Sequence, residues 1–335
     1  MLRAITVIGL MCLPNAAFAQ SGAFRIGSWN ITNLHHETGV PLRGDAKARD
    51  DIDYTRLKDF AASLDLDIVA LQEIGSPKAL SRVFPGEQYH FILSKDYVDG
   101  AENQPADQRD IYTAFALRKS AFPSLPDVRT LDALHIVHLE IGRDGKASDR
   151  PVRSGLILPL TIGGKQIEVL NVHLKSSCNS SSLSPVFDER QDGSVNPSRY
   201  DCRTLLAQTA ILENWLEQRQ ELGIQTIVLG DFNRQLNREG ATDHMWQMLN
   251  DGTPEGLGFV KAPLEPNTVC WPSPHTAFFP NSIDFITYDQ SLLPRLDPKT
   301  IKKIGIPFAD DARYAGDDNQ KLSDHCPTVG VLTVN

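Results

Sequence analysis

The 335-residue sequence predicts an α/β domain whose β-sheets contain antiparallel pairs of strands. Two observations carry this prediction. Short runs rich in Val, Ile and Leu alternate with longer amphipathic segments, a pattern typical of strands connected by helices. In addition, the apolar runs 154–162 and 166–174 flank Gly163-Gly164, and a Gly-Gly turn between two such runs predicts a β-hairpin.

The expected elements follow one another without a linker or an internal repeat that would divide the chain. We expect strands at 24–29, 67–71, 89–93, 112–117, 154–162, 166–174, 226–229, 283–288 and 328–334. We expect helices at 51–64, 200–220 and 243–249. The longest helix has one apolar face, which indicates packing on a sheet and is formed by Leu205, Leu206, Ile211, Leu212, Trp215 and Leu216.

The N-terminus has the form of a secretory signal peptide. Arg3 precedes the apolar run 4–13, which is too short to span a bilayer, and Ala17-Phe18-Ala19 has the small-x-small form of a cleavage site. A buried strand or a membrane anchor is the alternative, but Pro14 interrupts the run. We therefore expect a signal peptide at 1–19, cleavage near Ala19, and a periplasmic or secreted protein whose residues 20–335 form a single domain. We also expect a monomer without stable membrane insertion.

Composition narrows the class of protein. Lys and Arg number 33 against 42 Asp and Glu, so the net charge is −9. This charge argues against a dedicated nucleic-acid binder that relies on an overall basic surface, but it leaves a metal-assisted enzyme open. The hydrophobic content of 41% is ordinary for a globular protein and excludes a multi-spanning membrane protein.

The cysteines indicate an oxidising compartment. Cys12 would leave with the signal peptide, and Cys178, Cys202, Cys270 and Cys326 would remain. An even number of cysteines in an exported protein favours disulfides. Three pairings are open, and we favour Cys178 with Cys202 and Cys270 with Cys326. A zinc site is the less favoured alternative because the cysteines are scattered and no C-x-x-C occurs.

Polar residues lie at or near one end of six expected strands. They are Asn30, Gln72 with Glu73, His173, Asp231 with Asn233, Asp284, and Asp324 with His325. Any one of them also suits a turn or a helix cap. Together they supply three oxygen ligands for a hard cation (Asn30, Glu73 and Asp324), two imidazoles, and carboxylates that can orient them.

In these residues the sequence resembles the endonuclease/exonuclease/phosphatase superfamily, which includes deoxyribonuclease I, exonuclease III and neutral sphingomyelinases. The motifs occur in family order and are Ser28-Trp-Asn30, Leu71-Gln-Glu73, Asn171-Val-His173-Leu-Lys-Ser176, Gly230-Asp-Phe-Asn233, Ser282-Ile-Asp284 and Ser323-Asp-His325. The form Asn-Val-His-Leu-Lys-Ser-Ser-Cys is similar to a secreted bacterial branch. The resemblance implies a four-layer α/β sandwich, in which helices flank two central mixed β-sheets and the site lies where the sheet ends meet.

The resemblance also implies roles. Glu73, with Asn30 and Asp324, would hold Mg²⁺, although Mn²⁺ or Ca²⁺ would also suit such a site. His325, oriented by Asp284, would activate the attacking water. Asp231 and Asn233 would lie beside the scissile phosphate, and His173 would donate to a phosphoryl oxygen. Arg153, which precedes a strand, matches a phosphate-contacting arginine, with an exposed ion pair as the alternative.

The substrate is less well defined by the sequence. We expect a nuclease that acts on DNA in preference to RNA, with backbone contacts from basic loop residues such as Arg43, Lys47, Arg49, Lys175, Arg190, Arg199, Arg234 and Arg238. A solvated basic rim without substrate contacts is the equal alternative for these residues. A sphingomyelinase-type phosphodiesterase or another phosphatase is the alternative, and the first is suggested by the loop 270–280, which carries Trp271, Phe278 and Phe279. A non-catalytic secreted binding protein is a remote third possibility. Endonuclease or exonuclease action stays open.

Overall fold

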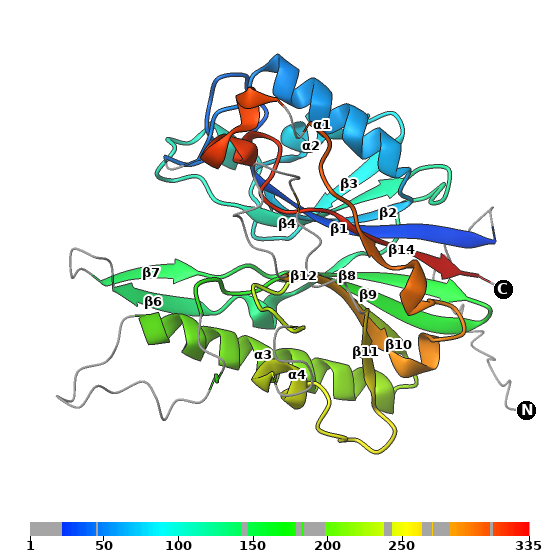
Figure 1. Ribbon diagram of the computed structural model, residues 1–335. Helices are drawn as coiled ribbons and strands as arrows, with labels where there is room; N and C mark the ends of the chain where they lie inside the picture. Colours follow the sequence, from blue (N-terminus) through cyan, green and yellow to red (C-terminus); the bar gives the residue numbers. More distant parts are fainter. Residues whose placement is uncertain are drawn as a thin grey trace, which may run out of the picture.

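Two six-stranded mixed β-sheets form the centre of the protein, and helices cover their outer faces (Figure 1). The structure is a computed structural model that describes residues 22–44, 46–141, 147–178, 182–183, 198–237, 243–262, 270, 282–308 and 311–334. Helix, sheet, sheet and helix follow one another as four layers, so the predicted α/β sandwich is confirmed. The expected signal peptide lies outside the described residues.

The first sheet contains segments from both ends of the described chain, in the strand order β13-β14-β1-β2-β4-β3. Its strands are β1 (Ala23–Leu34), β2 (Ile68–Ile74), β3 (Tyr89–Leu93), β4 (Tyr112–Arg118), β13 (Lys302–Lys303) and β14 (Thr328–Thr333). β1 runs parallel to β2 and antiparallel to β14. Segments about 300 residues apart in sequence are therefore neighbours in this sheet.

Helices α1 (Asp51–Leu64) and α2 (Pro77–Val83) cover this first sheet. α1 begins at a capping box, in which Asp50 accepts hydrogen bonds from the N–H groups of Ile52 and Asp53. The aromatic ring of Phe60 in α1 packs edge-on against Trp29 of β1. The sequence analysis missed α2, although Ser76 as N-cap and Pro77 in the first turn are start signals.

The second sheet has the strand order β11-β12-β10-β9-β8-β5. Its strands are β5 (Arg129–Leu131), β8 (Gly155–Ile162), β9 (Lys165–His173), β10 (Gln225–Asp231), β11 (Phe259–Lys261) and β12 (Asp284–Asp289). The predicted hairpin is confirmed as β8 and β9, and its turn places Gly163 and Gly164 at φ values of 55° and 74°. The left-handed region is open to glycine at little cost, which explains the two glycines.

Helices α3 (Ser198–Glu221) and α4 (His244–Met248) cover the outer face of the second sheet, and β6 (Val137–Ile141) and β7 (Ala147–Pro151) form a separate two-stranded ribbon. The apolar face predicted for the long helix is confirmed, because Leu205, Leu212 and Leu216 are fully buried. No helix in the described ranges is both long and apolar enough to cross a membrane.

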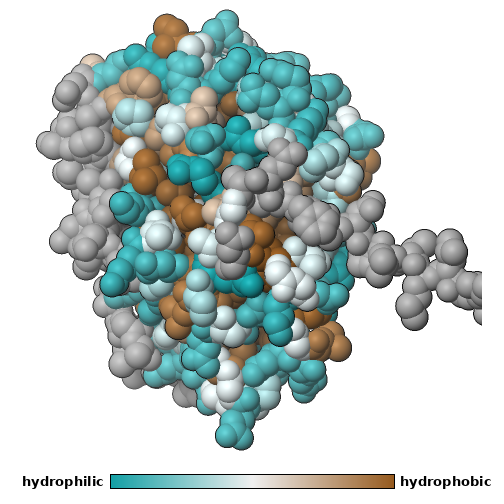
Figure 2. Space-filling view, turned by 90° about the vertical axis from the view of Figure 1, so that its right-hand side faces the viewer, coloured by the Kyte–Doolittle hydropathy of each residue, from teal (hydrophilic) through white to brown (hydrophobic). Residues whose placement is uncertain are grey.

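The space between the two sheets is filled by apolar side chains of both, including Ile26, Phe115 and Leu229. On one side of the molecule, hydrophobic residues gather towards the middle and hydrophilic residues predominate above and below them (Figure 2). One polar link crosses the interior, where Gln72 of β2 donates to Asn171 of β9 at 2.7 Å. Asn171 in turn donates to the carbonyl of Ala114 in β4. These bonds satisfy buried amides and tie the two sheets together.

All of the strands and helices that the sequence predicts are present, with ends shifted by a few residues. The largest shift is in β1, which continues to Leu34 where the prediction ended at residue 29. The elements that were missed are short ones, namely β5, β6, β7, β11, β13 and α2. A strand of two or three residues carries no measurable alternation, so periodicity cannot reveal it.

Candidate active site

The polar residues at the strand ends meet where the two sheets face each other. The register of the second sheet pairs Asp231 with His173 on one neighbouring strand and with Asp284 on the other. Asn30 of β1 and Glu73 of β2 approach from the first sheet, as the hydrogen bond between Asn30 and Asp231 shows. Residues that are far apart in sequence therefore form one cluster.

The side chain of Asn30 joins the two sheets at this cluster. Its Nδ2 atom donates to Glu73 Oε1 at 3.2 Å and to Asp231 Oδ2 at 3.1 Å. Its Oδ1 atom accepts from the N–H of Thr32 at 3.0 Å, which fixes the amide with its nitrogen towards the carboxylates. Two carboxylates from different sheets thus share one amide group.

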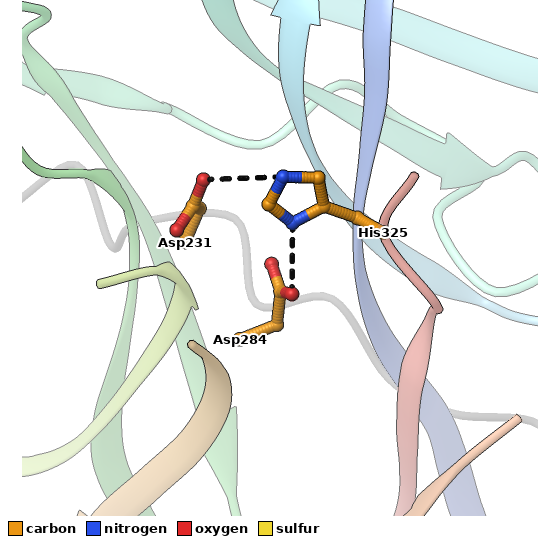
Figure 3. Close-up of side chains that lie close together, drawn as sticks. All are labelled: Asp231, Asp284 and His325. Carbon is orange, nitrogen blue, oxygen red and sulfur yellow. Dashed lines mark hydrogen bonds and ion pairs between the residues drawn. The ribbon is translucent and has the colours of Figure 1, made fainter. Parts of the chain in front are cut away.

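His325 and Asp284 form a hydrogen-bonded pair beside Asp231 (Figure 3). His325 Nδ1 lies 2.9 Å from Asp284 Oδ2, and His325 Nε2 lies 4.0 Å from Asp231 Oδ2. Two further contacts hold the His325 segment: Trp29 Nε1 donates to the carbonyl of His325, and the N–H of His325 donates to Ser323 Oγ. An imidazole whose one ring nitrogen donates a hydrogen bond to a carboxylate can use its other nitrogen to accept a proton or bind a ligand.

Burial and neighbouring charges set the protonation of this group. Burial alone would lower the pKa of His325, but the carboxylates of Asp284 and Asp231 raise this pKa well above 6.5. Burial raises the pKa of Asp231 to about 7, with His325 opposing this shift and Asp284 adding to it. Asp231 therefore changes protonation near neutral pH, and perturbed pKa values of this kind are common at functional sites.

The cluster is rich in acidic oxygens that a cation would stabilise. Glu73 Oε2 accepts from the N–H of Asn33 at 2.9 Å, and Asp324 Oδ1 accepts from Thr32 Oγ1 at 2.5 Å. Within the described part of the chain, no Lys or Arg forms an ion pair with Glu73, Asp324, Asp231 or Asp284. Carboxylates whose charge is offset by no Lys or Arg and by a single imidazole fit a hard divalent ion.

A second grouping also has metal-ligating atoms in reach of one another. One ligand atom each from Asp231, Asp284 and His325 lies within 4.8 Å of the others, which makes this a possible metal site. Because His325 Nδ1 already binds Asp284, an ion here would meet the Nε2 atom of His325. The predicted ligands Asn30, Glu73 and Asp324 lie around the neighbouring carboxylates, so the two groupings are parts of one cluster.

His173 lies on the other side of Asp231, and only 5% of its surface is exposed. Its Nε2 atom is 3.6 Å from Asp231 Oδ2. Burial lowers the pKa of His173 well below 6.5, and the charges of Arg153, His325 and Arg43 add to this shift. His173 is therefore neutral near pH 7. Its Nδ1 atom has no hydrogen-bond partner among the described residues.

Asn233 and Arg153 also lie at the cluster. The N–H of Asn233 donates to Asp231 Oδ1 at 2.8 Å, and its Nδ2 atom donates to the carbonyl of Leu174. Arg153 is close enough for its charge to act on His173. The adjacent Ser154 is held by Asp96, which accepts from both its N–H and its hydroxyl group. All predicted site residues thus belong to one region.

The basic residues expected on loops differ in their environments. Arg49, Lys175 and Arg234 are not a solvated rim: Arg49 is buried, and Lys175 and Arg234 form ion pairs with Asp201 and Asp243. Arg190 and Arg238 lie outside the described residues, as do Trp271, Phe278 and Phe279 of the apolar loop, and the side chain of Arg199 is not described either.

The sequence analysis missed several residues that support the cluster. Arg49 donates to the carbonyls of Ile31, Thr32 and Asn33 in β1, and to those of Gln320 and Lys321 before Asp324. Thr32 and Ser323 also connect these two segments. Arg49 and Ser323 were named from the sequence for other reasons, but no local pattern could have found these contacts, because they depend on the tertiary approach of β1 and the 320–325 segment.

Both favoured disulfides are present. Cys178 pairs with Cys202, and Cys270 pairs with Cys326. The first links the segment after β9 to α3, and the second is attached directly beside His325. No tetrathiolate zinc site is therefore formed by these cysteines.

The sandwich and its Asp-Asp-His cluster are features of a phosphoesterase-type fold, and comparison with known proteins identifies the family. The family model described as "Endonuclease/Exonuclease/phosphatase family" matches residues 27–325, so the chain belongs to this family. No curated protein matches the sequence significantly.

Solved structures support the same fold. The human Nocturnin catalytic domain with bound sulfate matches at a TM-score of 0.54 and 14% identity, covering 96% of this chain and 97% of that one. A humanised D. rerio TDP2 matches at a TM-score of 0.52 and 19% identity, covering 93% of this chain and 100% of that one. Truncated Caenorhabditis elegans TDP2 matches at a TM-score of 0.50 and 16% identity, covering 93% of this chain and 97% of that one. At these identities the likeness concerns the fold.

Proposed function

We propose that the protein is a secreted or periplasmic, metal-dependent nuclease that hydrolyses phosphodiester bonds by in-line attack of water. The observation that carries this proposal is the line Asp284, His325, Asp231, in which a buried imidazole lies between two carboxylates. Membership of the family supports the reaction class, and the acidic cluster with Glu73 supports the use of a metal.

In this proposal His325 is the general base. Asp284 holds Nδ1 in the orientation that leaves Nε2 free to accept a proton from water, and its charge stabilises the imidazolium that results. Asp231, whose pKa is raised to about 7, can hold the proton that the leaving oxygen requires, or position the water. Because Asp231 contacts His173, Asn30 and Asn233, its position is well determined.

The remaining residues would bind the phosphate. Neutral His173 can donate one N–H to a phosphoryl oxygen, while the Asn233 amide and Arg153 supply further donors. Glu73, Asn30 and Asp324 would hold Mg²⁺ or a similar ion, with the Asn30 amide turned to offer its oxygen. The ion, when bound, supplies Lewis-acid neutralisation of phosphate charge.

An assay panel tests the proposal. The chain from residue 20 onwards is incubated with plasmid, single-stranded DNA, RNA, sphingomyelin and bis(4-nitrophenyl) phosphate, with Mg²⁺ or with a chelator. We expect Mg²⁺-dependent cleavage of DNA, which His325→Ala abolishes and the control His90→Gln, at the edge of the first sheet, preserves. Cleavage of sphingomyelin alone would establish the lipid alternative. Equal rates for His325→Ala and the unmodified chain would favour a non-catalytic binding protein.

The proposed location has a separate test. Expression of the full chain in a Gram-negative host should give a periplasmic or secreted product that begins at Gln20. Mass spectrometry of that product would show an intact N-terminus if no signal peptide were cleaved. Size-exclusion chromatography with light scattering tests the proposed monomer.

A further inference from the structure

Arg43 stands out among the basic residues near the candidate active site because its position is fixed although no acid in the described part of the chain pairs with it. It lies in the loop between β1 and α1. The preceding Leu42 is fully buried and packs so closely on Gly75 that a Cβ atom there would lie 2.5 Å from it. The carbonyl of Arg43 accepts from the N–H of Ala46 at 3.0 Å, which closes a turn.

The side chain of Arg43 is directed towards the site. Its Nε atom donates to Asn33 Oδ1 at 2.9 Å, and the N–H of Asn33 donates to Glu73 Oε2 at 2.9 Å. One residue therefore separates the guanidinium from Glu73. The charge of Arg43 also acts on His173, as does that of Arg153, so both arginines lie near the place expected for the phosphate.

The terminal nitrogens of Arg43 have no partner among the residues that the structure describes. Other partly exposed arginines form ion pairs, including Arg82 with Asp51 and Arg118 with Asp65. Arg43 is partly exposed and uses only its Nε atom. A guanidinium held at Nε with both terminal groups open is suited to two parallel hydrogen bonds with phosphate oxygens.

We infer that Arg43 binds a second phosphate of the substrate, next to the one that is hydrolysed. The substrate is then a chain with at least two phosphodiester groups, as in a polynucleotide, and an isolated phosphodiester would lack this contact. The inference rests on the proposed function for the position of the first phosphate. It makes Arg43 a determinant of specificity.

The test measures binding without turnover, in a His325→Ala background with Mg²⁺. The probe is a fluorescent oligothymidylate eight nucleotides long, together with a series in which one phosphate at a time is a neutral methylphosphonate. Arg43→Ala should weaken binding of the unmodified oligonucleotide about 5- to 10-fold and reduce the salt slope of log K by about 0.7. At one phosphate position, the methylphosphonate should weaken binding to the protein that retains Arg43. The same methylphosphonate should leave the affinity of Arg43→Ala unchanged, because that variant has already lost the contact.

The matched control is Lys165→Ala, which removes one charge at the far end of β9 from His173. The inference is wrong if Lys165→Ala changes the salt slope as much as Arg43→Ala does. It is also wrong if every methylphosphonate weakens binding to Arg43→Ala as much as it weakens binding to the protein that retains Arg43.

A purely structural role for Arg43 gives a different result. Asn33→Gly frees the Arg43 side chain but keeps the N–H that binds Glu73, and glycine accepts the left-handed φ of 51°. In otherwise unmodified protein, Arg43→Ala should weaken oligonucleotide binding by a larger factor than it lowers hydrolysis of bis(4-nitrophenyl) phosphate. Asn33→Gly, which keeps the charge of Arg43 but releases its side chain, should weaken oligonucleotide binding less than Arg43→Ala does. If both variants lose hydrolysis of bis(4-nitrophenyl) phosphate, the inference is wrong, and the role of Arg43 is to support the position of Glu73. If the parent hydrolyses no phosphodiester while the binding pattern is as expected, the proposed function fails and the phosphate contact stands.

Discussion

The guanidinium of Arg49 donates a 2.7 Å hydrogen bond to the main-chain carbonyl of Lys321, although the two residues are 272 positions apart. Further bonds from the same group reach carbonyls of β1. Arg49 therefore connects the strand that carries Asn30 with the segment that carries Asp324 and His325. Burial lowers its pKa, and the nearby acids Asp53, Glu73 and Asp324 oppose this shift.

Replacing Arg49 should weaken both folding and metal binding. Arg49→Ala leaves several buried carbonyls unsatisfied, and we expect a loss of about 3 kcal/mol in the free energy of unfolding. Arg49→Lys should keep the charge but lose most of the hydrogen bonds. Urea unfolding measures the first effect, and Mn²⁺ titration followed by electron paramagnetic resonance measures the second. Wild-type Mn²⁺ affinity in a folded Arg49→Lys protein would contradict this role.

Activity and stability should respond to pH in opposite directions. The pKa of His325 is raised above 6.5 in the folded state, so the stability it contributes is fully present below pH 6.5 and is lost as pH rises through the raised pKa. Activity requires the neutral imidazole and should increase over the same range. Rates and melting temperatures measured between pH 5 and 9 test this. A flat rate would argue against His325 as the base.

Asp284→Asn should separate two effects of Asp284 on His325, namely the orientation of the ring and the effect of the negative charge. The carboxamide is close in size to the carboxylate but does not stabilise the imidazolium, so we expect a rate about 10²-fold lower. The acid limb of the pH profile should also move to lower pH, since Asp284 raises the pKa of His325. Asp289→Asn, at the other end of β12, is the control. An unchanged acid limb in Asp284→Asn would show that the pair is only structural.

The link between the sheets should be important for stability. Asn171→Ala removes the acceptor of Gln72 and the donor to Ala114 in a fully buried place. We expect a loss of about 2 kcal/mol, because the partners are left without hydrogen bonds. Differential scanning calorimetry measures it, and Gln72→Leu with Asn171→Leu tests whether apolar groups restore stability. A melting temperature within one degree of the parent in Asn171→Ala would contradict the expectation.

Removing the two disulfides one at a time should have different effects on activity. Each cross-link stabilises the fold by about 2 to 4 kcal/mol through the loop it closes. The pair Cys270→Ser, Cys326→Ser acts beside His325 and should also lower the catalytic rate at temperatures where the protein stays folded. Cys178→Ser, Cys202→Ser should lower the melting temperature with a smaller effect on the rate. Equal rate losses would show that proximity to His325 is irrelevant.

The sequence predicted the layers of the fold and the residues that meet at the cluster. Asp231 and His173 show why this was possible. Each follows an apolar run at the end of a strand, so its place at a sheet edge is encoded locally. The contacts of Arg49, Thr32 and Ser323 are not encoded locally, because they arise only when the 320–325 segment reaches β1. For the same reason Arg49 was predicted among the basic loop residues that contact a phosphate backbone and is instead buried. The orientation of the Asn30 amide likewise depends on Thr32 and Asp231 together.

β14 pairs with β1 and follows shortly after His325, while β1, β2, β3 and β4 of the same sheet are built from residues before 120. A polypeptide emerging from the ribosome therefore carries an incomplete first sheet and no imidazole opposite Asp284 until the segment after residue 320 has been synthesised. Under the proposed nuclease function, this order would delay the appearance of a competent catalyst, so that a growing or prematurely terminated chain would pose little danger to the nucleic acids of the cell that makes it.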